Sequence, residues 1–331
     1  MKNHLYYYLL TSILSLAFMA TLMIFVFDKP LIVGWGKTAY DTKYQHFIDD
    51  SSSNIIIVAG SNGFFSHSCK VLEKDLNKNC INYSVSAGLG LEYILEKSKE
   101  VISDNTTVIL PLEFNFYYGE KKASLLSNGG NLHILENDLK YLFSFGYERT
   151  LYILFSKDFK YIFGSILENI LNSTGFERRF NISTLNENGD MKGHTKAKSK
   201  NYNEYVSSEL PPRPDISTCQ NSYNRKLIID YIKFVNKNGG KVFGSFPTTF
   251  ESNLTDNQSQ SFECIKNLYD ENNGYFINLK NKSMYKKFNF YDTTYHLNEE
   301  AQILHSQKIS KYLKNHNFID KTKHNTNDQH H

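Results

Sequence analysis

The sequence predicts an α/β fold in which a parallel sheet lies between two layers of helices. Two observations lead to this prediction. Short β-branched runs, such as NIIIVAG at 54–60, alternate along the chain with segments of helical spacing. Glycine or proline ends several of these segments, as at Gly60, Gly239 and Pro247. Such an alternation is typical of strands that pair in parallel, because each crossover helix returns the chain to the same edge of the sheet.

The order of elements follows from the same two signals. The expected strands are 54–60, 80–85, 107–112, 241–246 and 275–279. The helices expected between and after them are 65–76, 91–102, 222–238, 261–269 and 301–313.

Composition excludes several classes of protein. Among 331 residues, Lys and Arg number 37 and Asp and Glu number 34, which gives a net charge of +3. Positive and negative residues are too evenly balanced to suggest a nucleic-acid binder. A hydrophobic content of 40% argues against a disordered chain. No C-x-x-C pair occurs, so the sequence gives no support to a zinc ribbon or a thioredoxin-like site.

Shifts in composition indicate the domain organisation. The expected parts are an anchor at 1–28, a linker at 29–53, the α/β domain at 54–315 and a disordered tail at 316–331. Within the domain, 119–217 interrupts the alternation with apolar helical stretches followed by a polar run. We therefore expect an inserted helical lid, whose polar part at 186–205 is a mobile loop.

The segment Leu5–Phe27 carries no charged residue and is long enough to cross a bilayer as a helix. We expect an uncleaved signal-anchor rather than a cleaved signal peptide, because the apolar run continues into FVFDKP without a small-residue cleavage site. A lone N-terminal anchor serves mainly to deliver a domain across a membrane. The sequence thus predicts a single-pass membrane protein with an extracytoplasmic C-terminal domain.

Cysteine usage leaves two interpretations open. Pairing Cys69 with Cys80 and Cys219 with Cys264 would join neighbouring elements, as expected in an oxidising compartment. The alternative is four buried free thiols.

A serine follows the first predicted strand directly, in the turn Gly60-Ser61-Asn62-Gly63. Open parallel sheets place their ligand sites at the carboxyl ends of the strands. On a tight turn before a helix, a serine hydroxyl is exposed and nearby backbone N–H groups point outward to receive an oxyanion. Ser61 is therefore a candidate nucleophile, and the alternative is that it caps the following helix.

An acid and an imidazole lie close together before the last predicted helix, in FYDTTYHLN at 290–298. A carboxylate such as Asp292 can fix the ring tautomer of His296 while the other ring nitrogen takes a proton from a serine. The alternative is a solvated loop in which Asp292 caps the helix. After the second and third strands, Gly88 and Asn115 are candidate oxyanion donors, or ordinary turn residues.

Together these features resemble the SGNH (GDSL-like) hydrolase superfamily. Its blocks are a serine turn after strand one, a glycine after strand two, an asparagine after strand three and a late Asp-x-x-His. The matching residues, in the family's order, are Ser61, Gly88, Asn115, Asp292 and His296. Two departures are visible: the acid and the imidazole are four residues apart instead of three, and no glycine precedes Asn115 in LEFN. Because of the second departure, Glu113 is the other residue that could face the site.

The resemblance implies a three-layer, SGNH/flavodoxin-like fold and a serine esterase or O-acyltransferase that needs no metal or diffusible cofactor. An anchored domain of this type is similar to the polysaccharide O-acetylation proteins and the D-alanine-transfer proteins of teichoic acid. That similarity implies an acylated cell-surface carbohydrate as the substrate. In that role Ser61 attacks, His296 moves the proton, Asp292 orients the ring, and the Ser61 N–H with Gly88 and Asn115 holds the oxyanion. The alternatives are a lipid-directed esterase or thioesterase, and an inactive SGNH-like partner of a membrane-bound acyltransferase.

Overall fold

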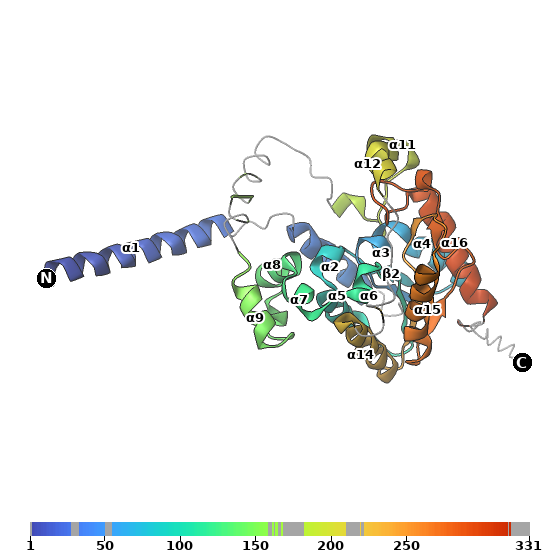
Figure 1. Ribbon diagram of the computed structural model, residues 1–331, viewed down its shortest axis with the longest axis horizontal. Coiled ribbons are helices and arrows are strands. Elements are labelled where there is room, and N and C mark those ends of the chain that lie inside the picture. Colours follow the sequence, from blue (N-terminus) through green and yellow to red (C-terminus); the bar gives the residue numbers. More distant parts are fainter. Residues whose placement is uncertain are drawn as a thin grey trace, which may run out of the picture. The chain divides into compact units, whose positions relative to one another are not determined.

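The computed structural model describes residues 2–27, 33–49, 55–157, 161, 163–164, 167, 182–209, 219, 222–316 and 318 (Figure 1). The predicted tail at 316–331 lies almost entirely outside the described residues. The chain divides into two compact units. Unit 1 comprises Met1–Ala39, Gly88–Gly90 and Leu125–Ile182, and unit 2 comprises Tyr40–Ala87, Leu91–Ser124 and Ser183–His331.

Unit 2 is built on a parallel five-stranded sheet with the order β2-β1-β3-β4-β6. Its strands are β1 (Ile55–Ile57), β2 (Cys80–Asn82), β3 (Thr107–Leu110), β4 (Lys241–Ser245) and β6 (Tyr275–Ile277). Every neighbouring pair in this sheet is parallel, which confirms the predicted α/β class. A smaller parallel pair joins β5 (Thr249–Phe250) to β7 (Met284–Tyr285).

The helices of unit 2 alternate with these strands. They are α3 (Ser61–Ser66), α4 (Cys69–Leu76), α5 (Leu91–Ser98), α6 (Asn115–Tyr118), α7 (Lys121–Leu125), α11 (Lys196–Ser199), α12 (Asn203–Ser208), α14 (Tyr223–Lys237), α15 (Asp256–Asp270) and α16 (Glu299–Asn315). Short 3-10 turns lie at η2 (Lys99–Val101), η4 (Ile182–Thr184), η5 (Lys200–Tyr202) and η6 (Lys287–Asn289). Side-chain caps mark the starts of the long helices, as at Ser222, Thr255 and Asn298, which satisfy first-turn N–H groups.

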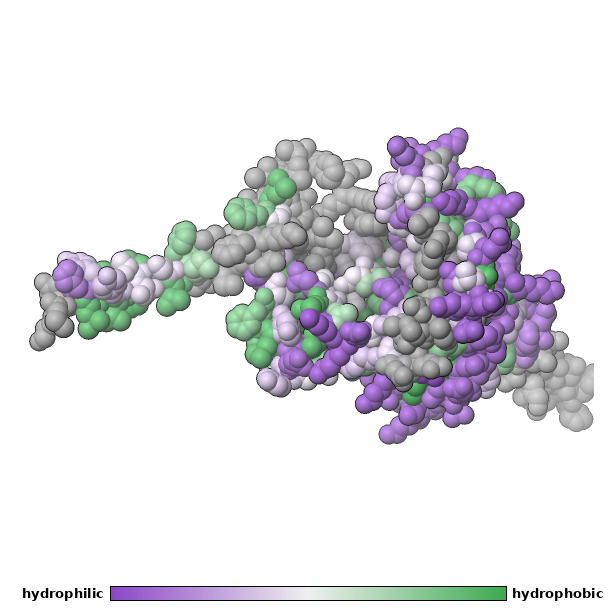
Figure 2. All heavy atoms as spheres, viewed as in Figure 1, coloured by the Kyte–Doolittle hydropathy of each residue, from purple (hydrophilic) through white to green (hydrophobic). Residues whose placement is uncertain are grey.

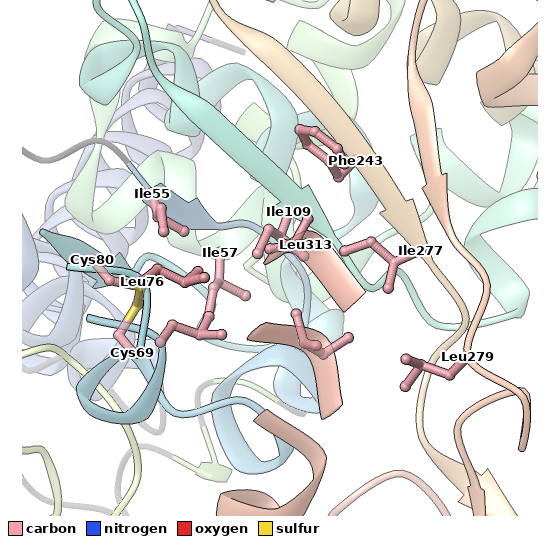
Figure 3. Close-up of a cluster of buried hydrophobic side chains, with 12 residues drawn as sticks. Ile55, Ile57, Cys69, Leu76, Cys80, Ile109, Phe243, Ile277, Leu279 and Leu313 are labelled. Atoms are coloured by element: carbon pink, nitrogen blue, oxygen red, sulfur yellow. A yellow bond between two sulfur atoms is a disulfide. The ribbon is translucent and has the colours of Figure 1, made fainter. Parts of the chain in front are cut away.

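The sheet is covered on both faces. Successive side chains of a strand point to opposite faces, and one face of this sheet packs against α4 and α16. The buried cluster on that face, drawn in Figure 3, contains Ile55, Ile57, Cys69, Leu72, Leu76, Cys80, Ile109, Phe243, Ile277, Leu279, Ile309 and Leu313. On the opposite face Gly244 leaves room for Tyr269 of α15, because a Cβ at this position would meet the tyrosine ring. The arrangement is compatible with the predicted three layers.

Unit 1 holds α1 (Lys2–Phe27), α8 (Asn128–Asn137), α9 (Tyr147–Leu154) and η3 (Leu139–Tyr141). Arg149 on α9 is buried, and its Nε donates a hydrogen bond of 3.2 Å to Asn131 Oδ1 on α8. The other side of α9 exposes apolar side chains, including Leu151 and Leu154. Figure 2 shows hydrophobic surface, in green, around α9.

The predicted membrane anchor, Leu5–Phe27, lies within α1. Among the residues that the structure describes, no helix has both the length and the apolar character needed for a membrane crossing. The predicted transmembrane segment is therefore unsupported.

The predicted linker at 29–53 contains a helix, α2 (Val33–Asp49). Within unit 2, Lys43 of this helix is buried, its Nζ donates to the Ser84 carbonyl oxygen, and it lies 4.8 Å from the centre of the Phe64 ring. Burial lowers the pKa of Lys43 to about 7. A lysine on the buried face breaks the amphipathic pattern, so the sequence did not indicate this helix.

The predicted lid at 119–217 is not one element. Its residues 125–182 belong to unit 1, whereas the described residues 183–209 belong to unit 2. The prediction that 186–205 is a loop is wrong, because the segment contains α11, η5 and the start of α12, whereas its mobility stays a prediction. Asp190 in this segment is buried and accepts hydrogen bonds from the Cys69 N–H at 2.8 Å and the Lys70 N–H at 3.2 Å, at the start of α4. Some polar residues there, such as Asn188 and Asp190, are buried hydrogen-bonding groups, which composition alone cannot distinguish from solvated ones.

All four cysteines form disulfides. Cys69 is bonded to Cys80 and Cys219 to Cys264, so the alternative of free thiols is wrong. The first disulfide ties α4 to β2.

Candidate active site

Ser61 lies at the carboxyl edge of the sheet. The chain leaves β1 at Ile57 and enters α3 at Ser61, which is the first helical residue. The N-cap position is Gly60, and it has no side-chain cap, so the alternative that Ser61 caps the helix is wrong. Ser61 is half-buried, and within the described chain its hydroxyl makes no hydrogen bond. The hydroxyl is thus available to another group.

Asp292 and His296 form the expected pair. His296 Nδ1 lies 2.6 Å from Asp292 Oδ1, and both residues are more than nine-tenths buried. A bridge between Phe290 and Leu297 closes the loop that carries both residues, and their side chains meet despite the four-residue spacing. Asn298, not Asp292, caps α16. When a carboxylate binds Nδ1 of an imidazole in this way, proton exchange takes place at Nε2.

Phe65 connects this pair to the helix that carries Ser61. The ring of His296 stacks on the ring of Phe65, with 4.0 Å between centroids and 6° between planes. Phe65 lies four residues after Ser61 on α3, and side chains at that spacing share one face of a helix. The Asp–His pair thus packs against α3 one helical turn after Ser61, and within the described chain no hydrogen bond joins the Ser61 hydroxyl to His296.

A polar network fixes the loop against α3. The Ser66 hydroxyl donates to the Tyr295 carbonyl oxygen at 2.8 Å and accepts from the Leu297 N–H at 3.2 Å. The Thr248 hydroxyl lies 2.9 Å from the same carbonyl oxygen, 2.7 Å from the Ser66 hydroxyl and 2.8 Å from Asn62 Oδ1. Sequence reasoning missed Thr248, although it lies in the turn three residues after the end of β4, at the carboxyl edge of the sheet where ligand sites form.

Glu113, rather than Asn115, faces the serine turn. The Gly60 N–H donates to Glu113 Oε2 at 3.2 Å and the Asn62 N–H to Oε1 at 2.9 Å, so the carboxyl group spans Ser61 on both sides. A Cβ at Gly60 would lie 2.5 Å from Oε1, which explains why the turn carries glycine here. Asn115 is exposed at the start of α6.

The charge state of Glu113 reflects opposing influences. The side chain is only 2% exposed, and burial raises the pKa of the carboxyl group. The two N–H donors and the nearby His296 act in the opposite direction without cancelling this effect.

Gly88 is an exposed residue of the 3-10 turn η1 (Ala87–Leu89) and belongs to unit 1, whereas Ser61, Asp292 and His296 belong to unit 2. The role of Gly88 as an oxyanion donor stays a prediction.

Another buried histidine borders the pair, and sequence reasoning missed it. His194 has both ring nitrogens buried without a hydrogen bond, and its ring lies edge-on to Phe65 at 5.4 Å and to Tyr291 at 5.9 Å. Burial lowers the pKa of His194 to about 3, so this imidazole is neutral at physiological pH. Among the described residues, no group of three or more His, Cys, Asp or Glu side chains is arranged to hold a metal ion.

No family model matches this chain, and no curated protein matches it. The functional interpretation therefore depends on the geometry of these residues and on the resemblance noted in the sequence.

Proposed function

We propose that this protein is an SGNH-type serine esterase or O-acyltransferase acting on acyl groups of cell-surface carbohydrate. The observation that carries the proposal is the Asp292–His296 hydrogen bond, on a loop whose imidazole stacks on Phe65 beside Ser61. A hydroxyl, an imidazole and a carboxylate that orients the imidazole are the groups that acyl transfer needs.

The reaction takes place in two steps. Ser61 Oγ attacks the acyl carbonyl carbon while His296 Nε2 takes the hydroxyl proton, and the carbonyl electron pair moves onto oxygen. When this electron pair re-forms the C=O bond, the C–O bond to the leaving alcohol breaks, and the alcohol oxygen takes the proton from His296. Water or a sugar hydroxyl then attacks the acyl-serine carbonyl carbon and gives its proton to His296 Nε2. The acyl–Oγ bond breaks as this second intermediate collapses, and Ser61 Oγ takes the proton back from His296. Asp292 keeps the ring tautomer correct throughout.

Three further observations support the proposal. The matching residues follow the chain order of the superfamily, with Ser61 after β1 and the Asp–His pair before α16. β1 lies between β2 and β3, so Ser61 follows the strand at which the winding of the sheet reverses, where open α/β sheets bind ligands. Two disulfides favour an oxidising compartment, as expected for an enzyme of the cell surface. Attachment to a membrane remains a prediction from the sequence.

Labelling with a fluorophosphonate tests the proposal. We expect the wild-type chain to form one adduct, located at Ser61 by peptide mass spectrometry, and Ser61→Ala to form none. Ser208→Ala is the matched control, because Ser208 is exposed and its hydroxyl bonds only within its own helix. The absence of any adduct, with p-nitrophenyl acetate hydrolysis equal in wild type and Ser61→Ala, would exclude a serine enzyme.

The substrate class is tested separately. An enzyme for short acyl groups on carbohydrate releases acetate from p-nitrophenyl acetate faster than it cleaves a long-chain ester. A strong preference for the long-chain ester would favour the lipid-directed alternative.

A further inference from the structure

The positions of Ser61 and His296 relative to each other are set by the residues around them. Ser61 opens α3, whereas His296 lies on the loop before α16, and within the described chain no hydrogen bond joins the two. Acyl transfer needs the nucleophile and its base within hydrogen-bonding reach of each other. The contacts that hold the serine turn (60–63) against the histidine loop (290–298) therefore decide whether the pair can react.

One side chain contacts the neighbours of both residues. Thr248 lies between β4 and β5; its backbone N–H donates to Asn62 Oδ1 at 3.1 Å, and its hydroxyl lies 2.8 Å from the same oxygen. Asn62 directly follows Ser61 in the chain. The Thr248 hydroxyl is also 2.9 Å from the carbonyl oxygen of Tyr295, which directly precedes His296. Thr248 thus bridges the residue after the nucleophile and the residue before the base.

The hydrogens available allow Thr248 to form this bridge without help. Asn62 Oδ1 accepts the Thr248 N–H, so the hydroxyl hydrogen of Thr248 is free to serve the Tyr295 carbonyl oxygen. The Ser66 hydroxyl lies beside the bridge, 2.8 Å from the same carbonyl oxygen and 2.7 Å from the Thr248 hydroxyl. Two hydroxyl hydrogens are enough for the contact between the hydroxyls and for one bond to the carbonyl oxygen.

The bridge is shielded from water and anchored to the sheet. Asn62, Ser66 and Thr248 are all fully buried, so a hydrogen bond lost here is not replaced by one to bulk water. Asn62 Nδ2 donates to the Pro111 carbonyl oxygen at 2.6 Å, just after β3. The serine turn is therefore fixed to the ends of β3 and β4, and Thr248 connects that fixed point to the histidine loop.

We propose that Thr248 is a positioning residue for the reaction at Ser61, whose hydroxyl holds the histidine loop where His296 can take the Ser61 proton. This inference rests on the proposed function. Thr248 acts through Asn62 and Tyr295 rather than on the reacting atoms. Without the hydroxyl, Asn62 keeps the Thr248 N–H, but the direct link from Thr248 to the histidine loop is lost.

The rate of fluorophosphonate labelling tests this role, because the reagent reports how readily Ser61 reacts with its base in place. Thr248→Val keeps the shape and the backbone N–H of threonine and loses only the hydroxyl. We expect its labelling rate and its kcat for p-nitrophenyl acetate to fall about 10-fold to 100-fold, with KM little changed. Thr248→Ser restores the hydroxyl and should label within about 3-fold of the wild-type rate.

Thr150→Val is the matched control. It removes a buried threonine hydroxyl that donates to the Leu142 and Gly146 carbonyl oxygens in unit 1, and it should label at the wild-type rate. Each labelling rate is divided by the folded fraction from circular dichroism, so that a lower stability does not count as slower chemistry.

The outcomes separate this inference from the proposed function. A wild-type labelling rate in Thr248→Val overturns the inference, and so does a Thr248→Ser variant as slow as Thr248→Val, because the hydroxyl is then not the group responsible. If the wild type forms no adduct at Ser61, the proposed function fails instead, and the role of Thr248 falls with it.

Ser66→Ala covers the case in which Thr248→Val does not fold. This variant leaves the Thr248 hydroxyl to donate to the Tyr295 carbonyl oxygen, so the bridge remains and labelling should slow by less than about 10-fold. A larger loss shows that Ser66 holds the loop, and it overturns the role of Thr248.

Discussion

Replacing Asp190 by asparagine removes the charge that holds the start of α4. The buried carboxylate accepts from the backbone N–H groups of Cys69 and Lys70, from the Ser68 hydroxyl, and from the Nδ2 atoms of Asn82 and Asn186. An asparagine offers one acceptor oxygen, and its NH₂ group faces donors. At least two buried donors therefore lose their partner.

The cost follows from that count. Hydrogen bonds to a charged group contribute about 1.5–3 kcal/mol each, and a buried donor without a partner costs about 1–3 kcal/mol. Two lost bonds at that contribution give a decrease of about 3–6 kcal/mol in the free energy of unfolding of Asp190→Asn. The exposed neighbour Glu187, whose ion pair with Lys70 spans 3.8 Å, provides the matched control, and Glu187→Gln should change the free energy by less than about 1 kcal/mol.

Urea denaturation followed by far-ultraviolet circular dichroism, with the disulfides intact, measures both values. Asp190→Asn should unfold at a clearly lower urea concentration than Glu187→Gln, with a similar slope. Equal midpoints for the two variants would refute the conclusion that the segment around Asp190 is part of the folded core of unit 2.

Two further predictions concern the stacked ring and the buried lysine. Phe65→Leu removes the ring on which His296 stacks, so kcat/KM for p-nitrophenyl acetate should fall about 10-fold to 100-fold. The matched change Phe288→Leu, at an exposed residue, should alter kcat/KM little. Equal kcat/KM values for the two variants would exclude a positioning role for Phe65. Lys43 has a folded pKa of about 7 against 10.5 ordinarily, so between these values the unfolded chain binds more protons and the free energy of unfolding rises with pH. Lys43→Met should abolish that rise in urea titrations, and Lys37→Met, an exposed change on the same helix, should retain it.

The sheet was predictable because its signal is local. The β1 residues Ile55, Ile56 and Ile57 are buried on both faces, so their hydrophobic run needs no partner to be recognised. The pairing of Asp292 with His296 was equally accessible, because both residues lie on one short loop.

The remaining features depend on contacts between distant residues. The burial of Lys43 depends on the Ser84 carbonyl oxygen and the Phe64 ring, which its Nζ contacts. The burial of Asp190 depends on the backbone N–H groups at the start of α4, which donate to its carboxylate. In both cases a charged side chain indicates solvent exposure until its partner is known. The choice between Glu113 and Asn115 depended on how the chain turns after β3, which the tetrapeptide LEFN leaves open.

The contact between Ser66 and Tyr295 joins residues 229 positions apart. A chain is synthesised from its amino terminus, so the turn bearing the nucleophile leaves the ribosome long before the loop bearing the base. Until the carboxyl-terminal stretch arrives, the proposed catalyst has a serine without its proton acceptor. Under the proposed function, we expect nascent chains and fragments cut before Tyr291 to be inert toward acyl groups, because they lack Asp292 and His296.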